Sequence, residues 1–315
     1  MKIVFFGSSE FSIPILQSLL SSSHSVVLVI TTPDRKKGRG QKLGASIVKR
    51  FAEETHLPVA APEKLSIASV VEQVKKLGPD FLVIASYGKM VPESIFTLPK
   101  IAALNIHPSL LPKHRGASPI QSAILEGDRK TGVSIADVTK ELDSGDLFAQ
   151  IETEIGENEN ALELSERLAE IGSKLVVKTL EEFCVGKISR MKQDPSQASY
   201  ARKLHRDCAQ IDWEKPAPYI HNQVRAYYPW PSAFTFLVGK RLKILETRLI
   251  KTQATAIGNT PGTITDVIPN KAIHVQTQNG LLELIHVQLE GRREMTAFEL
   301  ALGQRLRKGD RFASI

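Results

Sequence analysis

Short apolar runs alternate with helical patterns through the first half of the chain, and this alternation constrains the fold more than any other feature. The expected strands are residues 2–6, 25–31, 81–85, 102–106, 132–137 and 147–154. Apolar residues at helical spacing predict helices at residues 13–21, 45–55, 67–77 and 160–184. A strand–helix alternation of this kind predicts βαβ units, and therefore an α/β domain with a doubly wound, Rossmann-like sheet.

The last third of the chain has a different pattern. One helix is expected at residues 216–226, followed by short strands at 233–238, 242–249, 262–267, 272–277 and 281–289. Asn279-Gly280, between the last two strands, is typical of a hairpin turn. About five short strands predict a small OB-like β-barrel, a fold that often binds nucleic acids. The resulting division is a Rossmann-like domain at residues 1–189, a polar linker at 190–208 and an OB-like domain at 209–315.

The net charge of +7 is unevenly distributed. Residues 200–315 hold 17 Lys and Arg against 10 Asp and Glu, whereas residues 1–199 hold 24 of each. The whole excess therefore belongs to the last third, which indicates a polyanionic partner such as nucleic acid. A basic domain without such a partner explains the charge equally well.

The two cysteines, Cys184 and Cys208, are too few for a disulfide framework, and no Cys/His cluster indicates a zinc site. We therefore expect a cytoplasmic protein without a metal. No apolar stretch is long enough to cross a membrane. The first strand is followed by Gly7-Ser8-Ser9-Glu10, which lacks the three glycines of a dinucleotide-binding turn and disfavours a nicotinamide enzyme.

The strongest local signal is the run Asn105-Ile106-His107-Pro108, at the carboxyl end of an expected strand. Side chains two residues apart in a strand point the same way, and open α/β sheets place their active sites at this edge. An amide can donate to a developing oxyanion, and an imidazole can move a proton near neutral pH. Acyl transfer to an amine needs both functions. An isolated Asn and His at a strand end more often satisfy backbone groups.

A second polar cluster is Asp143-Ser144-Gly145-Asp146, directly before another expected strand. A carboxylate brought to the same edge would orient His107 and raise its basicity. Taken alone, this sequence is also ordinary turn chemistry.

Together these segments resemble the folate-dependent formyltransferases. The resemblance is carried by NIHPSLLPKHRGASPIQ at residues 105–121, by the DSGD turn and by the opening GSSEFS. AQIDW at 209–213, VRA at 224–226 and PWP at 229–231 are similar to the members of that family that act on methionyl-tRNA. The resemblance implies a catalytic trio of Asn105, His107 and Asp143. It also implies 10-formyltetrahydrofolate as the formyl donor, the charged initiator tRNA as the acceptor and no metal.

The resemblance also implies where the folate lies. Residues 85–91 would run along the pterin, and the residues expected to contact the folate are Tyr87, Gly88, Ser109, Leu110, Leu111 and Pro112. His114 and Arg115 are further candidates for contacts with a folate carboxylate or an RNA phosphate. Many relatives have glycine where this chain has Pro108.

A basic loop at residues 33–42 follows the second expected strand. Such a charge run is usually a solvated surface. Given the resemblance, we expect it to reach the acceptor end of tRNA through Arg35, Lys36, Arg39 and Lys42. We expect the protein to act as a monomer. Three alternatives stay open at this point: formyl transfer to a small amine, hydrolysis of the formyl-folate, and RNA binding without catalysis.

Overall fold

The computed structural model describes residues 1–37, 42–250 and 260–313. The chain divides into two compact units. The first comprises Met1–Pro119, Lys130–Glu154 and Ser165–Ala201, and the second comprises Ile120–Arg129, Ile155–Leu164 and the residues from Arg202 onward. Two short segments that precede residue 165 therefore belong to the same unit as the C-terminal part.

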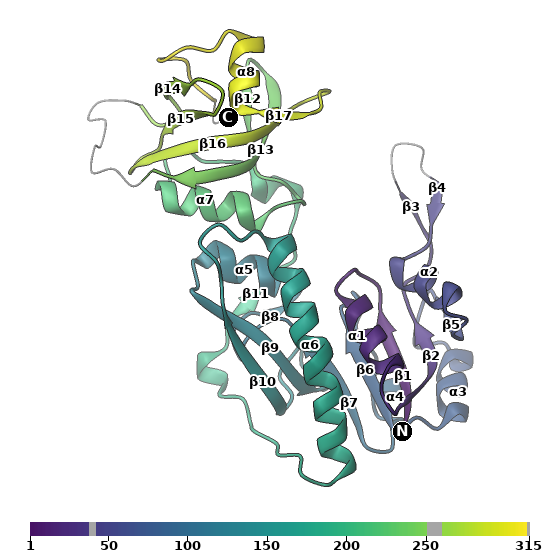
Figure 1. The fold of residues 1–315 in the computed structure, drawn as a ribbon. Helices are drawn as coiled ribbons and strands as arrows, with labels where there is room; N and C mark the ends of the chain where they lie inside the picture. Colours follow the sequence, from purple (N-terminus) through teal and green to yellow (C-terminus); the bar gives the residue numbers. More distant parts are fainter. Residues whose placement is uncertain (38–41, 251–259, 314–315) are drawn as a thin grey trace. The chain divides into compact units, whose positions relative to one another are not determined.

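The first unit is built on a seven-stranded sheet with the order β10-β9-β7-β6-β1-β2-β5 (Figure 1). Its strands are β1 (Lys2–Gly7), β2 (Ser25–Ile30), β5 (Val59–Ala60), β6 (Phe81–Ala85), β7 (Ala102–His107), β9 (Lys130–Asp137) and β10 (Leu147–Glu154). The five strands from β7 to β5 run parallel, while β9 and β10 pair antiparallel. The predicted Rossmann-like sheet is confirmed.

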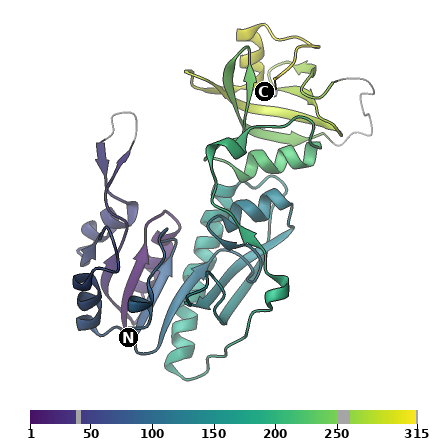
Figure 2. The ribbon, with the colours of Figure 1, turned by 180° about the vertical axis from the view of Figure 1, so that it is seen from behind.

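Helices cover both faces of this sheet. They are α1 (Ser12–Leu20), α2 (Ile47–Glu54), α3 (Ala68–Leu77), α4 (Glu93–Phe96) and α6 (Ala161–Cys184). On one face α1 and α6 touch, because Ser18 Oγ donates to the Ser173 carbonyl at 3.0 Å; this face is toward the viewer in Figure 1 and turned away in Figure 2. On the other face, Val74 of α3 and Ile95 of α4 share an apolar cluster with Ala103 of β7. Asn105 and His107 follow Ala103 at two-residue spacing, so they belong to this second face.

Several short elements complete the first unit: β3 (Arg35–Lys37), β4 (Lys42–Gly44), β8 (Arg115–Gly116), η1 (Pro195–Gln197) and β11 (Tyr200–Ala201). Two short helices, α5 (Pro119–Glu126) and η2 (Arg206–Ala209), belong to the second unit apart from Pro119. The segment predicted as a basic loop at 33–42 thus contains β3 and the first residue of β4, which pair antiparallel. The segment predicted as a linker contains β11, which pairs with β8. Neither pairing was predicted, because each involves only two or three residues and leaves no periodic pattern in the sequence.

The second unit contains an antiparallel sheet with the order β12-β13-β16-β15-β14, in which β17 also pairs with β16. Its elements are α7 (Ala217–Ala226), β12 (Phe234–Leu237), β13 (Lys240–Leu249), β14 (Ile264–Ile268), β15 (Ala272–Gln276), β16 (Leu281–Leu289), β17 (Glu294–Thr296) and α8 (Ala297–Gln304). The five predicted strands are present, and Asn279-Gly280 lies between β15 and β16 with Gly280 at φ 95°. β17 and α8 were not predicted.

The C-terminal residues close this sheet into a barrel. The Ile264 N–H donates to the Asp310 carbonyl at 2.8 Å, beside β14 at one edge of the sheet. The Ala313 N–H donates to the Phe236 carbonyl at 3.0 Å, on β12 at the other edge. Between them, Phe312 stacks on the buried Trp213 with ring centroids 5.9 Å apart. Satisfying both edges removes the unpaired backbone groups of an open sheet, and the predicted OB-like fold is confirmed.

His221 of α7 is buried inside the second unit. Its Nδ1 lies 2.9 Å from Thr247 Oγ1, and its Nε2 lies 3.1 Å from the Glu157 carbonyl. Burial lowers the pKa of His221 below its usual 6.5, an effect that the Glu157 carbonyl partly opposes. The folded state therefore favours the neutral ring.

This lowered pKa predicts an acid-sensitive second unit. Below pH ~6.5 the unfolded chain binds a proton at His221 that the folded chain resists, so stability falls as the pH drops from there through the folded pKa, by at most about 1.4 kcal/mol per pH unit. His221→Gln should flatten this dependence. Urea unfolding followed by tryptophan fluorescence measures it, since Trp213 and Trp230 both belong to this unit. His205→Gln, at an exposed position, is the control, and equal pH dependence in wild type and His221→Gln would contradict the prediction.

Candidate active site

β7, an interior strand of the first unit's sheet, carries Asn105 and His107 at its carboxyl end. Asn105 pairs with Ile84 on one side and Ala136 on the other, and His107 pairs with Ser134. The two side chains therefore come from a strand that is held on both sides. Such a strand fixes the separation and direction of an amide and an imidazole better than a loop does.

Asp143 lies beside both of these residues. Its Oδ1 accepts a hydrogen bond from Asn105 Nδ2 at 2.9 Å, and its Oδ2 accepts one from the Gly116 N–H at 2.8 Å. The same Oδ2 lies 3.7 Å from His107 Nδ1. We call these four residues, Asn105, His107, Gly116 and Asp143, the Asp143 cluster. The structure thus brings together the trio expected from the sequence.

The hydrogen bonds of the trio define what each group can still do. One N–H of the Asn105 amide is used by Asp143, and no partner for the other is found within the described residues. His107 Nε2 lies 2.9 Å from the His114 carbonyl, which can only accept, so this nitrogen carries a proton. The position left for proton exchange is Nδ1, on the side of Asp143. Active-site hydrogen bonds that are long in the absence of substrate often tighten when it binds, which fits the 3.7 Å separation.

The segment Ser109–Pro112 is tied to β9 and β10 by its backbone. Ser134 of β9 donates to the Ser109 carbonyl at 2.6 Å and accepts from the Leu111 N–H at 3.0 Å. Gln150 of β10 donates to the Leu111 carbonyl at 3.0 Å. The Ser109 hydroxyl donates to the Lys113 carbonyl at 2.6 Å, so it holds its own loop. Leu111 is buried, whereas Leu110 and Pro112 are half-buried. Part of the apolar surface of Leu110 and Pro112 is therefore exposed.

Tyr87 and Gly88 follow β6, the neighbour of β7. The Tyr87 ring is 2% exposed and packs edge-on against Phe6, with centroids 5.5 Å apart. Burial raises the pKa of Tyr87 to about 12, and its hydroxyl has no partner among the described residues. Gly88 has φ 80°, and no heavy atom lies within 4 Å of the position that a Cβ would take. The main chain at residues 87–88 therefore borders open space, while the ring supports the core.

Three of the four basic residues expected to contact tRNA lie in the β3–β4 pair. Arg35 is exposed, and in the strand register Lys36 pairs with Leu43 and Lys42 pairs with Lys37. Arg39 lies outside the described residues.

Two residues of the site were not recognised from the sequence as its supports. Gly116 provides the N–H that caps Asp143 Oδ2, and Gln193 donates to the carbonyls of Asp143 and Gly145 at 2.8 and 2.7 Å. Arg115 was expected to face a ligand, but it is 6% exposed and donates to Gln193 Oε1. Gly116 has φ 117°, a conformation that glycine tolerates and other residues rarely adopt. The only sequence signal for this role was therefore the presence of a glycine directly after Arg115.

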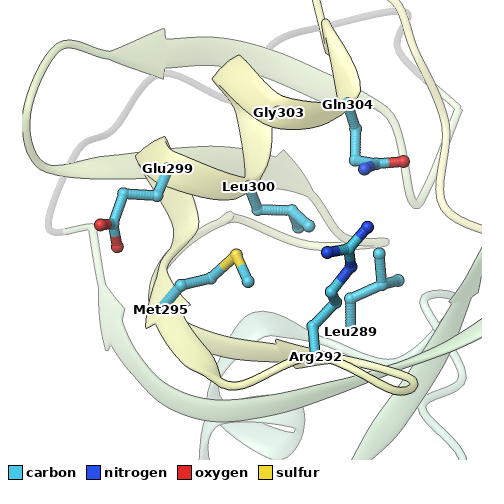
Figure 3. A pocket seen from close by; sticks show the side chains of 7 residues that line it. All are labelled: Leu289, Arg292, Met295, Glu299, Leu300, Gly303 and Gln304. Carbon is cyan, nitrogen blue, oxygen red and sulfur yellow. The ribbon is translucent and has the colours of Figure 1, made fainter.

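No group of three or more His, Cys, Asp or Glu side chains is placed to hold a metal ion in the part of the chain that the structure describes. In the same residues no helix has the length and apolar character needed to cross a membrane. A pocket of about 260 Å³ lies in the second unit, between α8 and the β16–β17 hairpin (Figure 3). It contains none of the residues of the Asp143 cluster, and is lined by Leu289, Arg292, Met295, Glu299, Leu300, Gly303 and Gln304.

Comparison with known proteins agrees with this geometry. Residues 1–180 match the formyl transferase family, and residues 203–305 match the formyl transferase C-terminal domain. The chain therefore belongs to the formyl transferase family, which confirms the resemblance found in the sequence. The methionyl-tRNA formyltransferase of Sulfurihydrogenibium sp. (strain YO3AOP1) is 39% identical to it over 99% of this chain and 100% of the relative.

Solved structures share the fold at low sequence identity. The methionyl-tRNA formyltransferase from Clostridium thermocellum has a TM-score of 0.55 and 17% identity, over 79% of this chain and 94% of that one. HypX from Aquifex aeolicus, in complex with tetrahydrofolic acid, has a TM-score of 0.63 and 16% identity. That alignment covers all of this chain but 51% of HypX, so this chain spans about half of HypX.

The capping of Asp143 by Gly116 predicts a sensitive position. A Cβ at Gly116 would lie 2.5 Å from the Ala201 carbonyl, so Gly116→Ala must push β8 away from β11 and move the N–H that binds Asp143. We expect kcat for formyl transfer to fall by roughly 10-fold or more, as displacements of about 1 Å in an active site do. Gly303→Ala is the control, because a Cβ there meets no heavy atom within 4 Å. Unchanged kcat in Gly116→Ala would remove this N–H from the account of the site.

Proposed function

We propose that this enzyme transfers the formyl group of 10-formyltetrahydrofolate to the α-amino group of the methionine carried by the charged initiator tRNA, methionyl-tRNA. The observation that carries the proposal is the Asp143 cluster, which joins an amide, an imidazole and a carboxylate at the end of β7. The chain's membership of the formyl transferase family defines the reaction class. The 39% identical relative named methionyl-tRNA formyltransferase supports this particular acceptor.

The proposed roles follow from the hydrogen bonds. In the reaction the amine nitrogen bonds to the formyl carbon, the bond from that carbon to the folate nitrogen breaks, and the proton lost by the amine passes to the folate nitrogen. The second N–H of Asn105 donates to the formyl oxygen as negative charge develops on it. His107 moves the proton at Nδ1, since Nε2 is engaged by the His114 carbonyl. Asp143 orients both groups and needs no metal to do so.

The donor site is proposed next to β6. The main chain of Tyr87 and Gly88 offers unoccupied space at the strand end, so it can lie along the planar pterin. We propose that Leu110, Leu111 and Pro112 provide apolar contacts and that Ser109 holds their loop in place. HypX, whose fold is shared, is a protein solved with tetrahydrofolic acid. That likeness supports the proposal that this chain also has a folate site.

The acceptor is proposed to use both parts of the chain. Residues 1–189 would catalyse the transfer, residues 190–208 would connect, and residues 209–315 would bind tRNA. Residues 200–315 hold 17 basic and 10 acidic residues, and this excess of positive charge favours binding to the phosphate backbone of a nucleic acid. Arg35, Lys36, Arg39 and Lys42 would contact the acceptor end of the tRNA. Because initiator tRNA is used in translation, the enzyme would act in the cytoplasm, and we propose that it does so as a monomer.

A direct assay tests the function. Purified protein is incubated with labelled 10-formyltetrahydrofolate and charged initiator tRNA, with an amino sugar as the competing acceptor and with no acceptor as the blank. We expect the label on the methionyl-tRNA. Preferential labelling of the amino sugar would favour the small-amine alternative, and label released as formate at the same rate in the blank would favour hydrolysis.

The assigned roles predict the effect of removing either β7 side chain. Asn105→Ala loses the donor to the formyl oxygen, and His107→Ala loses the proton carrier. Each should lower kcat by roughly 100-fold or more, as loss of an oxyanion donor or a proton-transfer group does. Circular dichroism checks that both variants fold. Turnover near that of the wild type in either variant would remove that residue from the mechanism.

The proposed role of the β3–β4 pair predicts a selective effect on tRNA. Arg35→Ala should raise KM for methionyl-tRNA and reduce the salt dependence of tRNA affinity by about one unit of log–log slope, if Arg35 contacts a phosphate. KM for the folate should stay unchanged. Lys76→Ala, at an exposed position on α3, is the control. A parallel loss of folate binding would place the pair beside the donor instead.

A further inference from the structure

We infer that Gln193, in the segment that leads out of the first unit, is a positioning residue that holds Asp143 in its catalytic geometry. The inference rests on the proposed function, because it concerns the residue that orients the groups performing the transfer. Gln193 touches none of the reacting groups itself. It acts through the backbone of the Asp143 turn and through Arg115.

The Gln193 amide is fully used. Its Nε2 donates to the Asp143 carbonyl at 2.8 Å and to the Gly145 carbonyl at 2.7 Å. Its Oε1 accepts from Arg115 Nε at 3.1 Å and from Arg115 Nη2 at 2.7 Å. A primary amide has two donors and two acceptor positions, so all four are engaged. A side chain with every position committed is held in one orientation.

These contacts reach Asp143 from two sides. Gln193 binds the backbone carbonyl of Asp143 directly. It also fixes Arg115, and the next residue, Gly116, donates its N–H to Asp143 Oδ2. The backbone and the carboxylate of the same residue are thereby tied to one amide, which defines both the position and the rotation of the Asp143 side chain.

The turn at Asp143 needs this support. Asp143 has φ 51°, in the left-handed region, which residues other than glycine adopt only as single, locally supported positions. Gly145 is packed against the backbone, since a Cβ there would lie 2.0 Å from the Asp137 carbonyl. Gln193 donates to carbonyls on both sides of Ser144, so it bridges the turn where its backbone is least favourable.

Gln193 is itself held in place by the segment around it. On one side, Met191 and Leu147 exchange two backbone hydrogen bonds at 2.8 and 2.9 Å. On the other, Ser199 Oγ accepts from the His114 N–H at 2.9 Å, and Tyr200–Ala201 pair with Arg115–Gly116. The amide is therefore anchored between two fixed points on the first unit. An anchored amide can impose a geometry on the turn, whereas a mobile one could not.

The test uses Gln193→Glu, which keeps the length of the side chain and an acceptor for Arg115 but loses both donors to the turn. The matched control is Gln197→Glu in the same segment, where the side chain is exposed and bonds only Asp194 at 3.3 Å among the described residues. We expect Gln193→Glu to lower kcat for methionyl-tRNA formylation by roughly 10-fold or more, as misplacement of a catalytic group does. KM for folate and tRNA should change less than twofold, and the pH profile of kcat should shift. The control should behave as the wild type does.

Arg115→Met provides a second route, since it removes the anchor of Gln193 without changing the amide. It should lower kcat less than Gln193→Glu does, and the double variant should lose no more than about twofold beyond Gln193→Glu, because both changes break one network. If Gln193→Glu does not fold, a reduced kcat and shifted pH profile in Arg115→Met support the inference, and unchanged values overturn it. If Gln193→Glu folds and matches the control in kcat and pH profile, the inference is wrong. Wild-type protein that does not formylate methionyl-tRNA would instead refute the proposed function.

Discussion

The carboxylate of Asp143 joins the groups of the site, because it contacts side-chain and backbone groups from separate chain segments. It accepts one hydrogen bond from a strand side chain, Asn105, and one from a loop N–H, Gly116, and it stands beside His107. Hydrogen bonds to a nearly buried carboxylate offset the free energy lost when it is removed from water, whereas the same carboxylate without partners would destabilise the fold. The three chain segments that supply these groups must therefore meet at one point, and the folding of β7, β8 and the Asp143 turn is coupled through it.

Left-handed backbone conformations occur at Asp143 and at residues that follow or support the site strands. Ser86, His114 and Asp143 have φ of 49°, 57° and 51°. Hydrogen bonds hold each of them: Ser86 Oγ accepts from Ser9 Oγ, the His114 carbonyl lies 2.9 Å from His107 Nε2, and the Asp143 carboxylate accepts from Asn105 and from the Gly116 N–H. Conformations of this kind are typical of functional sites, where a rigid sheet supports loops that local preference alone would not form.

The elements that the sequence predicted are those set by long periodic patterns. The parallel strands β1, β2, β6 and β7, the helix α6 and the five barrel strands were predicted because burial imposes a repeat over many residues, whereas the two-residue strand β5 was missed. Asn105, His107 and Asp143 drew attention by their chemistry at strand ends, but it was the resemblance to the formyltransferases that singled them out as a trio. β8, β11 and Gln193 could not, because a two-residue pairing and one polar side chain in a polar stretch leave no periodic signal. Their importance comes from contacts between segments 78 residues apart, such as Arg115 and Gln193.

In the proposed mechanism the negative charge of Asp143 organises the formyl-transfer site. Asp143→Asn tests it most directly, because the variant keeps the size of the side chain and an acceptor for Asn105 while removing the negative charge beside His107. Single-turnover transfer from 10-formyltetrahydrofolate to methionyl-tRNA would be measured together with folate affinity. We expect a rate lower by roughly 100-fold or more, with folate affinity within twofold of the wild type. A rate near that of the wild type would contradict it.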